Sequence, residues 1–282
     1  MAVKPKLALA VSGGKDSMGM VYALKDLPNI VVLTVDHRLR EESAGEALQV
    51  QRWMMELNVP HVILTWEHDG IDTDIQNKAR TARYDLMTQW CWEHGVKYLM
   101  TAHHREDQIE TFFMRLAKGS GLKGLGVMHD ATTYNNITIL RPFLSVPKKT
   151  LHNYIEHENF IEDPSNQNEA FERIRFRSLV KDYIKLDPDA NILKTIDKLK
   201  MVDEYLDGAI QDISVDKLLE LDYVLFERVI NSMFQDDYPF KSRKIKGLYE
   251  RLHDPEFKAT TFANHLFKKT KAGLEIVKEE KM

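Results

Sequence analysis

The chain has 282 residues, of which 43% are hydrophobic and 29% are charged, and its formal net charge is −4. This composition excludes a mainly disordered chain and supplies enough apolar residues for one large domain or two smaller ones. The slight acidic excess argues against a general nucleic-acid-binding protein, but it allows local basic patches. A single cysteine, Cys91, excludes an internal disulfide and any zinc or redox site built from two cysteines of one chain.

The N-terminal residues and the apolar runs indicate where in the cell the protein is found. The first residues lack the apolar core and the cleavage site of a secretory signal peptide, and no apolar run approaches the length needed to cross a bilayer. Together with the single cysteine, these features predict a cytoplasmic protein with no membrane partner.

The first half of the chain alternates short apolar segments with longer amphipathic ones. Strands are expected at residues 6–11, 30–35, 61–65, 96–101 and 137–140. Helices are expected between them at about 16–27, 44–57, 74–94 and 106–116. This alternation predicts an α/β fold, in which a parallel five-stranded sheet has helices on both faces and binds ligands at the carboxyl ends of its strands.

The second half is richer in helical patterns. Helices are expected at residues 148–160, 173–185, 191–213, 217–234 and 242–252, followed by a hairpin of residues 260–268 and 274–278. Pro and Asp at residues 186–189 separate two helical segments and indicate a boundary near residue 187. We therefore expect a first domain over residues 1–187 and a small, mainly α-helical domain over residues 188–282.

A glycine loop follows the first expected strand and precedes the first expected helix. It consists of Ser12, Gly13, Gly14, Lys15, Asp16 and Ser17. The glycines allow close approach of a phosphate, the helix N-terminus presents amide donors, and the serines and the lysine add hydroxyls and positive charge. Asp16 would repel a bare phosphate and is interpreted as a ligand of a bridging Mg²⁺. The structural alternative is a capped strand–helix turn.

The glycine loop lacks the GxxxxGK[ST] pattern of a Walker A loop. It resembles instead the PP-loop of the ATP pyrophosphatases. That resemblance implies cleavage of ATP between its α- and β-phosphates and adenylation of a substrate oxygen.

A second cluster of polar residues, the acidic box, covers residues 101–111. His103 ends an expected strand, and Asp107, Glu110 and Thr111 share one face of the helix that follows. These groups can bind Mg²⁺, orient a nucleophilic amine or remove its proton. The alternative is an acidic first turn that complements the helix dipole.

Two further pairs of residues fit phosphate or nucleotide recognition. Arg80 and Arg83 are three residues apart on an expected helix and share a side, so they can contact phosphates or RNA; alternatively they are solvated surface arginines. Asp36 and His37 lie at the carboxyl end of the second expected strand, which fits nucleotide recognition. The alternative is that they are simple turn residues.

Several segments in the same order resemble one PP-loop family, the tRNA(Ile)-lysidine synthetases. These are residues 35–40 (VDHRLR), 79–84 (ARTARY), 101–111 (TAHHREDQIET), 119–125 (GSGLKGL), 141–144 (RPFL) and 163–166 (DPSN), with Arg173 and Arg177 downstream. The resemblance spans about residues 7–180. The chain departs from the family at Arg38, where Gly is usual, at Glu106, where Asp is usual, and at Ile174, where Asn is frequent. Its length resembles the short members of the family.

This resemblance implies a two-step ligation. The C2 carbonyl oxygen of the wobble cytidine in tRNA(Ile) with a CAU anticodon attacks the α-phosphate of ATP, and free L-lysine then displaces AMP to give lysidine. It implies the following roles: catalysis by Asp16, His103, Asp107 and Glu110; ATP or pyrophosphate binding by the glycine loop, Asp36, His37 and Arg83; RNA or phosphate contacts by Arg80, Arg173 and Arg177; Mg²⁺ binding by Asp16 and Asp107. Glu110 is the residue expected to receive the lysine ammonium.

The second domain is expected to bind tRNA. Its basic residues gather at Lys241, Arg243, Lys244, Lys246 and Arg251, with a second group at Lys268, Lys269 and Lys271. Basic residues of this kind can position RNA by contacting its phosphates. The alternative interpretation is that they form a solvent-exposed helix face without a ligand. The sequence leaves the oligomeric state open, with a homodimer as one option.

Two other functions stay open. A tRNA thiolase of the PP-loop type would need a catalytic cysteine or an iron–sulfur cluster, but Cys91 lies between Trp90 and Trp92 in an expected helix, where packing is the better interpretation. The second open function is that of a relative that binds ATP or RNA without catalysis.

Overall fold

A computed structural model describes residues 6–68, 70, 73–155, 159–162, 172–187, 190–211, 213–234, 240, 242–270 and 273–278. The chain forms two compact units, Met1–Asp197 (unit 1) and Lys198–Met282 (unit 2). The division falls inside helix α8 (Asn191–Ala209), further along the chain than the boundary expected near residue 187.

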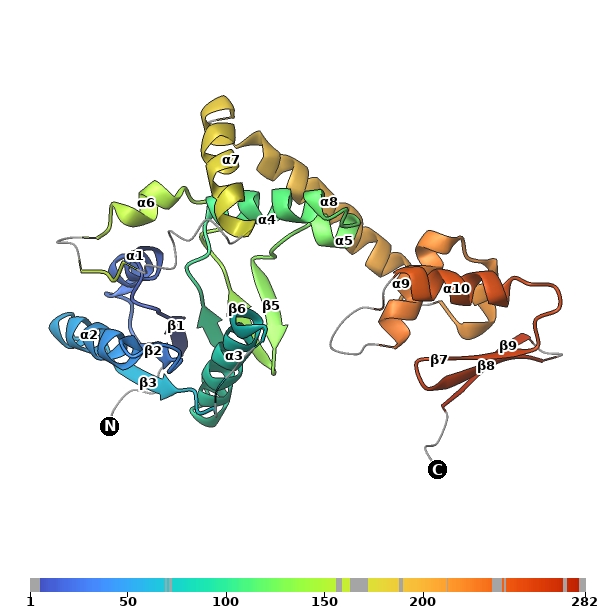
Figure 1. Ribbon diagram of the computed structural model, residues 1–282, viewed down its shortest axis with the longest axis horizontal. Coiled ribbons are helices and arrows are strands. Elements are labelled where there is room, and N and C mark those ends of the chain that lie inside the picture. The colour runs from blue at the N-terminus through green and yellow to red at the C-terminus, as the bar shows by residue number, and fades with distance from the viewer. Residues whose placement is uncertain are drawn as a thin grey trace. The chain divides into compact units, whose positions relative to one another are not determined.

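Unit 1 contains a six-stranded sheet in the order β3-β2-β1-β4-β6-β5 (Figure 1). The strands are β1 (Leu7–Ala10), β2 (Ile30–Asp36), β3 (His61–Thr65), β4 (Tyr98–Met100), β5 (Ala131–Tyr134) and β6 (Ile137–Leu140). All neighbouring strands are parallel except β5 and β6. The five expected strands are thus confirmed, and the carboxyl ends of β1, β2 and β4 meet at one edge of the sheet.

Strand β5 is absent from the sequence-based expectation. It is only four residues long and three of them are exposed, so it lacks the apolar pattern of the other strands. Asn135 and Asn136 join it to β6 with φ angles of 47° and 62°, as in a tight two-residue hairpin turn. The hairpin covers the outer edge of β6.

Alternate residues of the central strands pack into two separate cores. Leu9 and Val32 belong to a core that includes residues of α1 and α2, whereas Ala8 and Leu33 belong to a core with Cys91 of α3. Successive side chains of a strand point to opposite faces, so both faces of the sheet are covered, as expected. Cys91 is fully buried, which agrees with a packing role.

The helices of unit 1 mostly follow the sequence pattern. They are α1 (Lys15–Leu24), α2 (Ser43–Glu56), α3 (Ile75–Glu93), α4 (Arg105–Ala117), α5 (Leu122–Leu125), α6 (Lys148–His152) and α7 (Glu172–Leu186). Helix α6 is much shorter than the helix expected over residues 148–160. Bonds from the Tyr154 and Ile155 amides to carbonyls three residues back tighten its end into a turn.

Unit 2 combines helices with a small antiparallel sheet. It contains the end of α8, a 3₁₀ helix (Val215–Glu220), α9 (Tyr223–Met233), α10 (Ser242–Leu252), β7 (Ala259–Phe262), β8 (His265–Thr270) and β9 (Gly273–Lys278). The helix expected over residues 217–234 is interrupted because the Asp222 carboxylate accepts from the Leu225 amide and starts α9 afresh. Nowhere in the described parts of the chain is a helix both long and apolar enough to cross a membrane.

The sheet of unit 2 corrects the expected terminal hairpin. Ala263 and Asn264 adopt φ angles of 51° and 57°, so the chain turns inside the segment expected as one strand. The result is a three-stranded sheet in the order β7-β8-β9. Phe267 of this sheet and Phe226 of α9 are fully buried in a common core.

Candidate active site

The glycine loop connects β1 to α1 at the edge where the parallel strands end. Gly13 has a φ of 83°, and a Cβ at this residue would lie 2.7 Å from Ile161 Cδ1 and 2.8 Å from Val50 Cγ2. The Ile161 amide also donates to the Gly13 carbonyl oxygen at 2.9 Å. Both the backbone conformation and the close packing therefore require glycine at residue 13.

The serines and the lysine of the glycine loop have partners within the protein. Ser17 Oγ donates to the Gly14 carbonyl oxygen at 2.8 Å and accepts from the Ser12 amide at 3.2 Å. Ser17 is buried, so it stabilises the loop, whereas Ser12 is exposed. Lys15 Nζ lies 4.8 Å from the centre of the Phe160 ring. Ser12 and Lys15 are the side chains of this loop best placed for an incoming phosphate.

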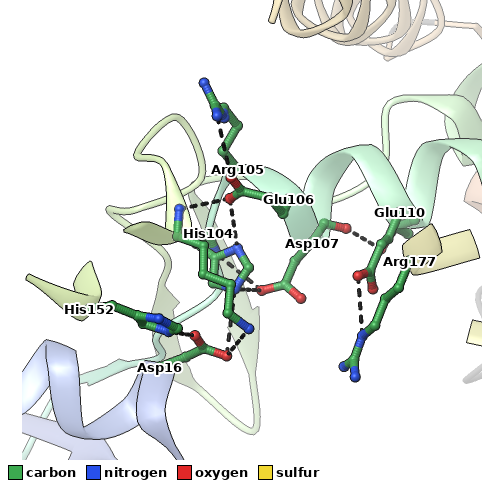
Figure 2. A network of polar contacts seen from close by, with 10 residues as sticks. Asp16, His104, Arg105, Glu106, Asp107, Glu110, His152 and Arg177 are labelled. Carbon is green, nitrogen blue, oxygen red and sulfur yellow. Dashed lines mark hydrogen bonds and ion pairs between the residues drawn. The ribbon is translucent and has the colours of Figure 1, made fainter. Parts of the chain in front are cut away.

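Asp16, in the first turn of α1, is the meeting point of three basic side chains (Figure 2). Its Oδ1 lies 2.7 Å from His152 Nε2, and its Oδ2 lies 3.2 Å from Lys148 Nζ and 3.6 Å from His104 Nε2. Burial raises the pKa of the Asp16 carboxyl, but His104, Lys148 and His152 outweigh burial and hold this pKa below its usual range. Asp16 is therefore a carboxylate at neutral pH.

His104 connects the glycine loop to the acidic box. Its side chain is only 3% exposed, with Nε2 3.5 Å from Asp107 Oδ2 and Nδ1 3.2 Å from Glu106 Oε2. Burial lowers the pKa of His104, but Asp16, Glu106 and Asp107 outweigh it and raise this pKa to about 9. A buried imidazolium thus holds three carboxylates together.

The carboxylates of Asp16 and Asp107 suit a magnesium ion. Both approach the same atom, His104 Nε2, and Asp107 is held at the start of α4 because its Oδ2 accepts from the His104 amide at 3.0 Å. Mg²⁺ commonly takes one or two carboxylates and completes its shell with phosphate oxygens and water. Among the described residues, no group of three or more His, Cys, Asp or Glu side chains forms a complete protein metal site.

Glu110, a further residue of the acidic box, contacts helix α7. Glu110 is buried, and its Oε1 lies 3.2 Å from Arg177 Nε of α7 (Figure 2). Arg177 was expected to contact RNA or a phosphate, and in the structure it contacts the Glu110 carboxylate. Arg173 lies in α7, but its side chain and the DPSN motif at residues 163–166 are outside the described part of the structure.

His103 faces a basic environment. Its Nδ1 lies 2.7 Å from Thr101 Oγ1. Burial lowers its pKa despite the opposing charge of Asp107, and the guanidinium groups of Arg141, Arg80 and Arg83 lower it further. His103 is therefore a neutral imidazole at pH 7, and burial and the neighbouring guanidinium groups disfavour its protonation.

The end of β2 forms a second part of the site. Burial and the charge of Arg83 lower the pKa of His37 to about 4, so Arg83 acts on both His37 and His103. Asp36 Oδ1 accepts from the Arg38 amide at 3.0 Å, and Arg38 has a φ of 50° in the region that favours glycine. An open cavity of about 390 Å³ is lined by Asp36 and the five residues Arg38, Leu39, Arg40, Glu41 and Ala44.

Sequence reasoning missed four basic residues of the site. His104 was visible in the acidic box but had no assigned role, and Arg141 was noted only within the RPFL segment. Arg141 is buried and donates to the His129 carbonyl and to Thr132 Oγ1, both at 3.0 Å. Lys148 and His152 are four residues apart on an expected helix. This spacing predicts that they share a face of the helix, but it does not predict what that face contacts.

Comparison with known proteins defines the class. The PP-loop domain family matches residues 2–183, and the chain belongs to this family. Among its relatives, the tRNA(Ile)-lysidine synthase of Orientia tsutsugamushi (strain Boryong) is 43% identical over 184 residues, which cover 63% of this chain and 42% of that protein. The enzyme of the same name from Bradyrhizobium diazoefficiens is 40% identical over 198 residues, covering 67% and 55%. The chain spans about half the length of the curated relatives it matches.

A solved structure supports the fold. The U34-tRNA thiolase NcsA from Methanococcus maripaludis, described with its [4Fe-4S] cluster, superposes with a TM-score of 0.53 over 69% of this chain and 71% of that chain. At 17% sequence identity, this likeness concerns the fold alone.

Proposed function

We propose that this chain ligates lysine to the wobble cytidine of tRNA(Ile) with a CAU anticodon, using ATP, as a tRNA(Ile)-lysidine synthase of the cytoplasm. The relatives named above support this proposal. The observation that carries it is the meeting of Asp16 from the glycine loop with Glu106 and Asp107 from the acidic box around His104. In this proposal, a nucleotide site and a site for a second, cationic substrate would be adjacent.

In the first step, the C2 oxygen of cytidine attacks the α-phosphate of ATP and pyrophosphate leaves. The glycine loop offers the amides of the α1 N-terminus, Ser12 Oγ and Lys15 Nζ to the departing phosphates. Asp16 and Asp107 would hold Mg²⁺, which offsets the charge that develops on the phosphates when it is bound. Asp36 and His37 at the end of β2 would contact the nucleoside, and Arg83, which acts electrostatically on His37, would contact a phosphate.

In the second step, the ε-amine of lysine attacks C2 of the cytidine, and AMP leaves with the C2 oxygen. The amine must lose a proton before it attacks. We propose that a carboxylate of the acidic box takes this proton, while the neutral imidazole of His103 orients the amine. Glu110 would receive the lysine ammonium before it is deprotonated. Its present contact with Arg177 is consistent with a carboxylate that favours a cationic partner.

The thiolase alternative is disfavoured by the state of the single cysteine. Cys91 is fully buried in the core beneath α3, and burial raises the pKa of its thiol to about 12. Such a thiol stays protonated and inaccessible, so it cannot act as a nucleophile. The alternative of a binding protein without catalysis is disfavoured because charged carboxylates and a neutral imidazole are both assembled at the site.

Unit 2 is proposed to contact tRNA through α10. Ile245, Leu248 and Leu252 are buried on one face of this helix, whereas Arg243, Lys244 and Lys246 are exposed. These three residues can contact phosphates. Arg251 is already engaged within unit 2, where its Nη1 donates to Thr260 Oγ1 at 3.1 Å. Lys241 lies outside the described residues.

The test is an assay of pyrophosphate release from ATP with tRNA(Ile) carrying a CAU anticodon, with and without radiolabelled lysine. Label is expected to enter the tRNA only when ATP is present. Pyrophosphate release without label would show that a different nucleophile is used. If neither pyrophosphate release nor incorporation of label were observed, the result would favour a protein that binds ATP or RNA without catalysis. A tRNA with another anticodon serves as the matched control.

A further inference from the structure

Helix α6 places two basic side chains on the carboxylate of Asp16. His152 Nε2 lies 2.7 Å from Oδ1 (Figure 2). Lys148 Nζ lies 3.2 Å from Oδ2, so each oxygen has its own partner on this helix. Lys148 and His152 are four residues apart and therefore share one face of the helix. Neither residue has a role in the ligation derived above.

The position of α6 is fixed by contacts at both of its ends. At its start, the Lys148 amide donates to Glu106 Oε2 at 2.8 Å, and the preceding segment accepts from the Arg105 amide through the Val146 carbonyl at 3.0 Å. Further along, a Cβ at Gly19 of α1 would lie only 2.6 Å from the Leu151 carbonyl oxygen. Helix α6 is thus docked on α1 and α4, which carry Asp16 and Asp107.

The two basic groups differ in how readily they can move. The Lys148 side chain is 41% exposed and ends in an ammonium on a flexible four-carbon stem, whereas the His152 side chain is 22% exposed and has a rigid ring. The Asp16 side chain is 36% exposed, so a ligand can reach it. Lys148 can therefore leave Asp16 while His152 continues to orient the carboxylate.

A divalent cation and the Lys148 ammonium cannot share Asp16 Oδ2 without strong repulsion. We propose, building on the function proposed above, that Lys148 is an exchangeable counterion. In the nucleotide-free protein it shares the Asp16 carboxylate with His104 and His152. When ATP arrives with its metal, the cation takes the place of Lys148 on Asp16, and the ammonium contacts the phosphate oxygens brought by the nucleotide.

This exchange predicts effects of opposite sign when the charge is removed. In Lys148→Met, Mn²⁺ alone is expected to bind about threefold to tenfold more tightly, because its competitor for Asp16 is gone. ATP measured at saturating metal is expected to bind about threefold to tenfold more weakly, because one phosphate contact is lost. Mn²⁺ binding can be followed by electron paramagnetic resonance, and ATP binding by calorimetry.

Lys149→Met is the matched control. Lys149 is the exposed neighbour on the same short helix, so this variant makes the same change of charge and side-chain type without touching Asp16. It should alter neither affinity by more than about twofold, since surface charges act weakly through solvent. Lys148→Arg retains the charge and should restore most of the ATP affinity.

The opposite shifts of the two affinities would support the exchange. Weaker binding of both Mn²⁺ and ATP in Lys148→Met would indicate a structural role and overturn it, as would changes no larger than those of Lys149→Met. A loss of ATP affinity with unchanged Mn²⁺ affinity would also overturn it. Because these measurements use neither tRNA nor lysine, their failure is distinguishable from failure of lysine transfer by the unaltered protein.

Discussion

Both units bury ion pairs, but they use them differently. In unit 2, Arg228 of α9 donates to Asp203 and Asp207 of α8, and both of its terminal nitrogens are engaged. In unit 1, one buried imidazolium, His104, faces the three carboxylates of Asp16, Glu106 and Asp107. The guanidinium of unit 2 joins two helices, whereas in unit 1 the carboxylates of Asp16 and Glu106 have the further basic partners Lys148 and Arg105. The comparison distinguishes a structural ion pair from a reactive one.

The largest expected effect is on activity, from Asp16→Asn. Loss of the carboxylate should reduce pyrophosphate release by about 10²-fold to 10³-fold, because a proposed metal ligand in the glycine loop is removed. Circular dichroism should show an unchanged fold. Asp26→Asn, an exposed acid just beyond the same helix, is the control. Normal pyrophosphate release by Asp16→Asn would contradict the metal-binding role.

The second effect is on stability, from Arg228→Met. This change leaves the carboxylate of Asp203 buried without its guanidinium partner, so the free energy of unfolding should fall by about 3–5 kcal/mol. Urea denaturation measures it, with Arg243→Met on exposed α10 as the control. If the two variants were equally stable, the buried ion pair would have no structural importance.

A smaller effect is expected from Gly13→Ala. The added methyl meets Ile161 and Val50 while the backbone stays at a φ of 83°, so the loop should distort at a cost of about 1–3 kcal/mol. ATP affinity measured by calorimetry should fall accordingly. Gly45→Ala in helix α2 has open space and should be neutral or stabilising by about 1 kcal/mol. Equal ATP affinities in the two variants would contradict the packing argument.

An effect of similar size, confined to acidic pH, concerns the stability of the protein and a histidine outside the site. Burial lowers the pKa of His61 to about 4, so the folded protein prefers its neutral form. Its contribution is complete above the unfolded-state pKa of about 6.5 and is lost as pH falls toward 4, a change of about 1–3 kcal/mol. His61→Phe should reduce the loss of unfolding free energy between pH 7 and pH 4.5. An unchanged pH dependence would contradict this origin.

The comparison also shows what local sequence signals can reveal. Five strands and the glycine loop were predictable because apolar runs and Ser-Gly-Gly patterns have local causes. Strand β5 was not, since most of its residues are exposed and its partner is set by a turn of two asparagines. Asp222 offered an N-cap signal that divides the helix expected over residues 217–234, but the continuous apolar pattern concealed it.

The composition of the site was harder to predict than its location. Both Asp16 and the acidic box were found from sequence, yet their meeting depends on β1 lying directly beside β4 in the sheet. Lys148 and His152 depend on a tertiary contact, the close approach of Leu151 to Gly19. Spacing along the chain describes one helix face well, but it cannot identify the partner that the face meets.

The contact between Gly13 and Ile161 has a consequence for the order of folding. These residues lie near opposite ends of the PP-loop domain, so their hydrogen bond joins segments that are far apart in the chain. Contacts of such long sequence separation form after local ones, because a large loop must first be closed. We therefore expect the helices and the strands paired over short stretches of chain, such as β5 and β6, to form early, and the glycine loop to reach its final geometry in a late phase of folding. A nascent chain would then gain the capacity to bind nucleotide only after residue 161 has left the ribosome.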